Sequence, residues 1–193
     1  MANRNTTGFG LIAQGTLGST PATGGQGKYY IQANYATSLY QGTAVKQSGG
    51  YVITAQAGIT DTCIGVLNGV FYNAATTQKP TWSNYYSQVT PANSENITAF
   101  VIDNPHQLYV GMIDTAIPIA NMGATFGFAT TTGSTTSGQS TNKMLLAGGS
   151  ATANTWRTVR IAEDPENQDI TVANCSVVFV QNLNQYANGV TMA

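Results

Sequence analysis

Short β-rich runs separated by turn signals are the feature that most restricts how this chain can fold. Runs of aromatic and β-branched residues, such as Lys28–Gln32, Tyr51–Ala55 and Thr98–Ile102, recur along the sequence with Gly, Pro, Asn or Asp between them. No stretch of about a dozen residues repeats apolar positions with the period of an amphipathic helix. About ten short strands, with turn signals roughly every 8–12 residues, are typical of all-β proteins. We therefore expect an all-β fold, a single β-sandwich or jelly-roll-like barrel.

The other expected strands follow one another along the rest of the chain. They cover Thr43–Lys46, Cys63–Leu67, Val70–Tyr72, Leu108–Ile113, Ala124–Phe128, Met144–Leu146, Thr158–Ile161 and Ser176–Val180. Asn68 and Gly69 lie between two of these runs and are the favoured pair for a two-residue type I′ turn, in which both residues need a positive φ. The sequence therefore predicts a β-hairpin at this point. Gly49 and Gly50 predict another turn, and Pro80 argues against a central strand in the segment around it.

An N-terminal arm is expected to precede the β-domain. Residues 1–27 are dominated by Gly, Thr, Ser, Asn and Pro, and such a segment cannot bury enough apolar area to fold alone. We expect a flexible arm over residues 1–27, followed by the β-domain over residues 28–193. The apolar residues of the arm, which we expect to contact a partner, are Phe9, Leu11, Ile12 and Leu17.

Charged residues are scarce throughout the chain. Only 15 of the 193 residues are charged, whereas Thr, Asn, Gln and Ser together number 69. A soluble monomer normally covers its surface with charge, and charge is depleted at the cores of protein interfaces. One long uncharged segment contains a run of Ser, Thr and Gly, Ala129–Asn142, which predicts a long exposed loop. The composition therefore indicates a component of a protein assembly rather than a free enzyme.

Net charge and hydropathy argue against two classes of partner. The net charge is −1 and the Lys and Arg residues are scattered, so direct binding of nucleic acid is not expected. No window approaches the roughly 18 apolar residues of a membrane span, so a membrane partner is not expected either. The apolar residues near the N-terminus form too short a run for a secretory signal.

Residues that carry chemistry are few and isolated. His106 is the only histidine and lies in a turn, without the Gly-x-Ser-x-Gly motif of a nucleophile. The densest group of charges contains four acids, Glu163, Asp164, Glu166 and Asp169, which lack the spacing of a calcium-binding loop. We expect a solvated, salt-bridged loop there, no catalytic residue, and no metal or other cofactor.

Two cysteines and one aromatic group leave alternatives open. Cys63 and Cys175 allow either one disulfide or two free thiols, and neither lies in a zinc-binding spacing. Trp82, Tyr85 and Tyr86 lie close together in a polar segment and are candidates for surface contacts. Rings of this kind on an exposed β-scaffold can stack on sugars, but aromatic residues are more often core or interface anchors.

Several segments resemble structural head proteins of tailed bacteriophages. They are Gly8–Gly10, Gly27–Ile31, Tyr40–Lys46, Ile64–Val66, Gly69–Tyr72, Lys79–Tyr86 and Ala99–Gln107. Together these segments extend over most of the chain, from Gly8 to about Val180. The pattern is similar to that of the capsid decoration, or cement, proteins.

The resemblance implies a place on the outer surface of a virion. Decoration proteins bind the capsid lattice from outside and bridge neighbouring major capsid subunits, so the major capsid protein is the expected partner. Such a protein is made in the cytoplasm of the bacterial host. A symmetric homo-oligomer is expected, with a trimer at three-fold positions favoured and a dimer at two-fold positions second. The family has no active site, so the resemblance implies no catalytic residue.

Two other functions stay open at this point. One is a glycan-binding head fibre or adhesin, which would use Trp82, Tyr85 and Tyr86 as stacking platforms. The other is the major capsid protein itself, whose common fold needs a long spine helix that this sequence does not predict. An enzyme comes last, because the sequence offers no paired acid and base.

Overall fold

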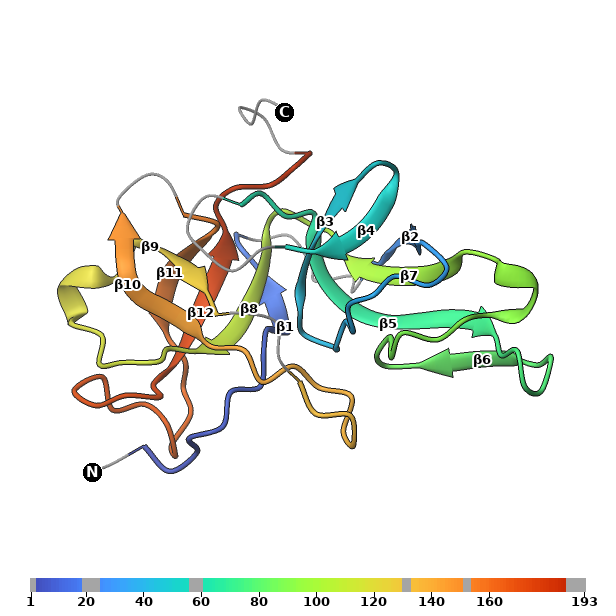
Figure 1. Cartoon of the computed structure of the whole chain (residues 1–193). Helices are drawn as coiled ribbons and strands as arrows, with labels where there is room; N and C mark the ends of the chain where they lie inside the picture. The colour runs from blue at the N-terminus through green and yellow to red at the C-terminus, as the bar shows by residue number, and fades with distance from the viewer. Residues whose placement is uncertain (1–2, 19–24, 56–60, 130–132, 151–153, 187–193) are drawn as a thin grey trace.

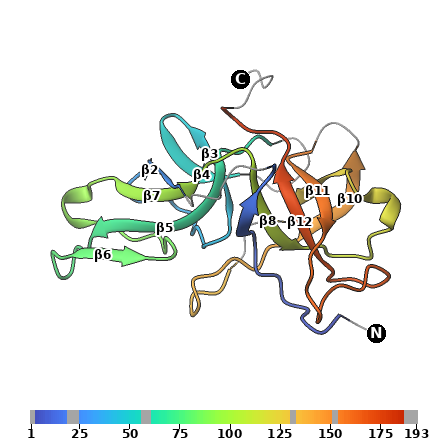
Figure 2. The ribbon, with the colours of Figure 1, turned by 180° about the vertical axis from the view of Figure 1, so that it is seen from behind.

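Two six-stranded antiparallel sheets form the protein. The computed structural model describes residues 3–18, 25–55, 61–129, 133–150 and 154–186. Sheet A has the strand order β1-β8-β12-β11-β9-β10, and sheet B has the order β2-β7-β5-β3-β4 with β6 added beside β5. The two sheets lie next to each other, sheet A on the left of Figure 1 and sheet B on the right, and Figure 2 shows the same division from behind.

The strands are short, and most of them match the expected runs. Their bounds are β1 Ile12–Thr16, β2 Gly27–Ile31, β3 Ala44–Ser48, β4 Tyr51–Thr54, β5 Gly65–Asn73, β6 Pro80–Ser83, β7 Ile97–Ile102, β8 Gln107–Met112, β9 Thr125–Phe128, β10 Met144–Ser150, β11 Trp156–Ile161 and β12 Ser176–Gln181. The helical elements among the described residues are two 3₁₀ turns, Ala92–Ser94 and Ile119–Asn121. None of the described helical elements has the length and hydropathy needed to cross a membrane. The all-β class, with its sandwich- or barrel-like sheets, is confirmed.

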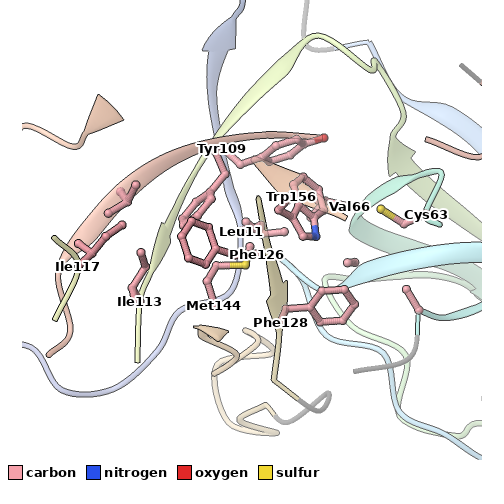
Figure 3. Close-up of a cluster of buried hydrophobic side chains, with 14 of the residues drawn as sticks. Leu11, Cys63, Val66, Tyr109, Ile113, Ile117, Phe126, Phe128, Met144 and Trp156 are labelled. Carbon is pink, nitrogen blue, oxygen red and sulfur yellow. The ribbon is translucent and has the colours of Figure 1, made fainter. Parts of the chain in front are cut away.

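Each sheet curves around a core of its own. In sheet A a parallel bridge between Ile113 and Met144 brings the start of β10 beside the end of β8. The core inside this curve includes Tyr109 and Trp156, whose rings meet edge to face at 5.4 Å between centroids (Figure 3). It also takes in Val66 of β5, so the two sheets share apolar contacts at their junction. In sheet B, β4 lies against β2, and the enclosed core contains buried aliphatic residues and Tyr86.

The turn at Gly49 and Gly50 is confirmed. Ser48 pairs with Tyr51, so these two glycines alone connect β3 to β4. Both have a positive φ, 57° and 86°, which glycine adopts without the steric cost that other residues meet. The pair therefore forms the tight hairpin that the twist of antiparallel strands favours.

The hairpin predicted at Asn68 and Gly69 is wrong. Both residues lie inside the continuous strand β5, and neither has a positive φ. Leu67 pairs with Val101 and Gly69 pairs with Phe100, so Asn68 is the extra residue of a β-bulge rather than part of a turn. The glycine serves another purpose, because a Cβ atom at this position would lie 2.5 Å from Cζ2 of Trp82.

The expectation of a separate arm is wrong for residues 3–17. Strand β1, Ile12–Thr16, pairs with β8 and forms one edge of sheet A. Leu11 is buried in the core of sheet A. Gly10, at φ 72°, and Gly42 let the two backbones approach, and the N–H of Leu11 donates to the carbonyl of Gly42 at 3.0 Å. The composition concealed this packing, because the glycines here permit close approach rather than mobility.

The first described residues are attached to a loop near the other end of the chain. The side-chain amide of Asn3 donates to the carbonyls of Asp169 and Ala173, each at 2.9 Å. The N–H of Asn5 donates to the side chain of Asn167 at 3.0 Å. These bonds satisfy polar groups that packing removes from water, so they fix the path of the N-terminal segment.

The Ser/Thr-rich run is partly packed rather than a wholly exposed loop. A bridge pairs Gly133 with Ser140, and the N–H of Ser140 also donates to the carbonyl of Gln41. Ser140 is fully buried. The side-chain amide of Asn84, the residue after β6, donates to the carbonyl of Ser137 at 2.8 Å, so the run is also bonded to the end of β6. Residues 130–132 of the run lie outside the described residues.

Candidate docking surfaces

Residues with catalytic potential do not assemble into a site in the described part of the chain. No group of three or more His, Cys, Asp or Glu side chains there could hold a metal ion. His106 is exposed in its turn, where its N–H donates to the side chain of Asn104 at 2.9 Å. Its carbonyl accepts the N–H of Leu17. These contacts give His106 a local structural role.

The acidic loop is held by pairing within the chain. Glu166 forms an ion pair with Arg4 at 3.0 Å, and both side chains are exposed. Asp164 accepts a hydrogen bond from the hydroxyl of Ser176 at 2.9 Å. Asp169 accepts hydrogen bonds from the hydroxyl and the N–H of Thr171, which lower the pKa of this carboxyl to about 2. The acids therefore order the loop that receives the N-terminal segment.

Both cysteines are free, buried thiols. Burial raises the pKa of Cys63 well above its usual range and raises that of Cys175 to about 11. Nucleophilic attack requires the thiolate, so these side chains are poor nucleophiles. The alternative of a disulfide between them is absent from the structure.

The four apolar residues of the N-terminal segment separate into two groups. Leu11 points into the core of sheet A and is not available to a partner, which corrects its expected role. Ile12 and Leu17 are 50% and 46% exposed, and Phe9 is partly exposed. Successive side chains of a strand alternate between faces, so Ile12 points outward where Leu11 points inward.

Ile12 lies on an aliphatic patch on the outer side of sheet A. It pairs with Val110 of β8, which in turn pairs with Val178 of β12, so the three side chains share one face. Leu108 and Val180 extend the same cluster. Leu17 is the residue after β1, and its N–H donates to the carbonyl of His106 at 2.8 Å, just before β8 begins. We call Ile12, Leu17 and Val110, with the cluster beneath them, the aliphatic face.

A pocket of about 260 Å³ opens beside this segment, at the junction of the two sheets. Its walls include Phe9 and Leu67, together with three side-chain amides, Gln41, Asn68 and Gln139. The amide of Gln41 donates to that of Asn68 at 3.0 Å, so the bulge residue is bonded across the pocket wall. Apolar walls with a few polar groups suit a side chain or small ligand.

A second exposed surface lies on sheet B. Tyr30 of β2 and Phe71 of β5 both pair with Thr98 of β7, and Phe71 also pairs with Trp82 of β6. Directly opposite residues share a face, so these side chains form one row across four strands. Phe100, two residues after Thr98, lies on the same face. We call Tyr30, Phe71, Trp82 and Phe100 the aromatic face.

Only one of the three aromatic residues singled out in the sequence belongs to this face. Trp82 is exposed there. Tyr86 is fully buried, and its hydroxyl donates to the carbonyl of Tyr35 at 2.8 Å, so its expected surface role is wrong. Tyr85 is partly buried and stacks on Tyr40 at 5.7 Å between ring centroids.

The other members of the aromatic face were not among the expected site residues, although a signal for them is present in the sequence. Tyr30 and Phe100 occupy alternate positions in runs that were already expected to be strands. An outward-facing aromatic residue at such a position is informative, because exposed strand faces are usually polar. Strand order was needed to bring the rings together.

Comparison with known proteins adds no family or relative to these observations. No protein-family model matches the chain, and no curated protein or solved structure gives a significant match.

Proposed function

We propose that this chain is a structural virion protein of a tailed bacteriophage. It binds the outer surface of the capsid and stabilises it by bridging neighbouring major capsid subunits. The observation that carries the proposal is the aliphatic face, where Ile12 and Leu17 stand exposed beside the junction pocket. Charged residues are few over the whole chain, as is typical of surfaces that become interface cores.

Each copy contributes a modest binding free energy, and the repeated sites of the capsid lattice add many such contributions together. Burying the exposed halves of Ile12 and Leu17 against a capsid subunit would contribute about 1 kcal/mol each. A homo-oligomer, a trimer first and a dimer second, would present several such faces to neighbouring subunits at once. Linked contacts of this kind increase overall affinity without any new contact type. The protein is made in the host cytoplasm and is placed on the outside of the assembled capsid.

Point substitutions test this proposal better than removal of residues 1–27, because that deletion also removes Leu11 and β1. We suggest the double variant Ile12→Asp/Leu17→Asp, which places two charges on the aliphatic face. The matched control is Ile119→Asp, a similarly exposed aliphatic residue on the 3₁₀ turn Ile119–Asn121. Thermal melts establish that all the variants are folded.

The assay is co-sedimentation with purified capsids that lack the protein. Copy number is read by gel densitometry against the major capsid protein. We expect the wild type and the Ile119→Asp control to saturate the capsid and the double variant to lose at least nine-tenths of its occupancy. Full occupancy by the double variant, or no sedimentation of the wild type, contradicts the proposal.

The two alternatives differ in what supports them. The major capsid protein finds no support among the described residues, which contain no α-helix. A glycan-binding role is favoured by a specific observation, the exposed rings of the aromatic face.

A further inference from the structure

The rings of the aromatic face are held in place by their neighbours. The rings of Trp82 and Phe100 are 5.1 Å apart between centroids. Gly69 leaves room for the indole to lie across β5. The amine of Lys28 lies 6.0 Å from the centroid of Phe100. The face is therefore arranged before any ligand arrives, which lowers the entropic cost of binding.

The size of the face argues against a second protein as its main occupant. Tyr30, Phe71 and Trp82 are 57%, 41% and 52% exposed. At about 150–250 Å² per aromatic side chain, these residues offer about 300 Å² of accessible surface. A stable protein interface buries about 800 Å² on each partner. The rings alone are too small to hold a second copy, but they match a short oligomeric ligand.

The charge of the face argues for a neutral ligand. Lys28, which pairs with Phe100, is the one charged residue among the paired residues of β2, β7, β5 and β6. The amine of Lys28 already lies near the ring of Phe100. Single-stranded nucleic acid also stacks on aromatic rings, but it needs a positively charged groove along its backbone. A chain with net charge −1 and scattered cations does not supply one.

Polar groups border the rings on the same face. The hydroxyl-bearing Thr98 lies between Tyr30 and Phe71 in the row. Asn73 follows Phe71 by two residues on β5, and its amide contacts the carboxylate of Glu95 at 3.5 Å. Sugar rings have an apolar face of C–H groups and an edge of hydroxyls. Rings bordered by hydroxyl, amide and carboxylate groups complement both parts.

We propose that the aromatic face binds a neutral oligosaccharide. The row from Tyr30 to Trp82 crosses three inter-strand spacings of about 4.8 Å, or about 14 Å in all. A sugar chain lies along this row, stacked on Trp82 and Phe71, passing over Thr98 and stacked again on Tyr30. The polar border groups bond its hydroxyls. The site is separate from the aliphatic face and does not depend on the proposed capsid binding.

The test uses the full chain and an array of immobilised neutral oligosaccharides, including gluco-, manno-, galacto- and N-acetylglucosamine oligomers. The variants are Trp82→Ala and Phe71→Ser. The matched control is Tyr186→Ala, an equally exposed aromatic residue outside the face. We expect the wild type and the control to be retained on at least one glycan class, and both face variants to bind at least tenfold more weakly.

Fluorescence gives a second measurement. Trp82 is half-exposed whereas Trp156 is fully buried, so a retained oligosaccharide should protect the emission of Trp82 from iodide quenching. Phe71→Ser keeps the fluorophore and is expected to lose this protection. It also keeps the test valid if Trp82→Ala fails to fold.

The outcomes separate the sugar site from the capsid contact. Sugar binding that survives in Ile12→Asp/Leu17→Asp, and capsid occupancy that survives in Trp82→Ala, support two independent surfaces. The inference is overturned if the wild type retains no neutral glycan, or if the face variants bind glycans as the wild type does. Loss of capsid or self-association by Trp82→Ala, without glycan binding by the wild type, also overturns it and assigns the face to a protein contact.

Discussion

Replacing Leu11 with alanine distinguishes a packed N-terminal segment from a free one. Leu11 is only 6% exposed, and its Cδ2 atom lies over Gly111 beside the ring of Phe179. Gly111 has no side chain of its own that could move into the space left by the substitution. Leucine-to-alanine changes at buried positions cost about 2–5 kcal/mol, through lost transfer free energy and the cavity that remains. We expect a decrease of about 3 kcal/mol in the free energy of unfolding.

Urea titration and thermal unfolding measure this loss. For a protein of this size, about 2–4 °C of Tm corresponds to each kcal/mol, so the expected decrease is about 6–12 °C. Leu17→Ala is the matched control from the same segment. Leu17 is half-exposed, so its substitution should cost less than about 1 kcal/mol. Equal, small shifts for the two variants would show that residues 3–17 do not contribute to the fold, and the assignment of β1 to sheet A would have to be withdrawn.

Two further predictions concern titratable groups that are buried or partly buried. Iodoacetamide at pH 8 should label neither Cys63 nor Cys175 in the native protein, and it should label both after unfolding in guanidinium. Mass spectrometry measures the adducts. An adduct on the native protein, or two unreactive cysteines in the unfolded chain, would contradict two buried free thiols. Burial, together with a hydrogen bond of 2.8 Å to Asp103, raises the pKa of Tyr29 far above 10. The native state therefore keeps a proton that the unfolded state loses, so the contribution of Tyr29 is complete below about pH 10 and decreases as the pH rises further. Tyr29→Phe should show a shallower alkaline loss of unfolding free energy than the wild type, and identical slopes would contradict this assignment.

The sequence predicted the body of the fold better than its edges. Runs such as Ser176–Val180 combine β-branched residues with strong hydrophobicity, a composition enriched in buried strands, and this run forms the buried strand β12. Strand β1 carries Gly and Thr instead, and it is held by pairing with β8 and by Leu11, contacts that local composition does not reveal. The residues Asn68 and Gly69 show the converse error. Their turn propensity is real, but pairing of β5 with β7 and β6 on either side outweighs it.

For the candidate surfaces too, local signals in the sequence were predictive and the long-range arrangement of residues was not. Ile12 and Leu17 were identified from the sequence because apolar residues in a polar segment are conspicuous. Tyr86 was misplaced because nothing local distinguishes it from Tyr85, and only the fold places its hydroxyl under the carbonyl of Tyr35. The aromatic face could not be assembled from the sequence, since its members come from four strands whose order is a property of the whole sheet.

The attachment of Asn3 to a loop 166 and 170 residues further along the chain has a consequence for biosynthesis. Ribosomes add about 5–20 residues per second, so the first residues wait roughly 10–30 s for their partners to be made. Contacts of such long sequence separation form slowly even in a complete chain. Until β1 pairs with β8, the edge of β8 is open and a neighbouring nascent chain can occupy it. Yield of correctly folded protein should therefore fall as expression or refolding concentration rises.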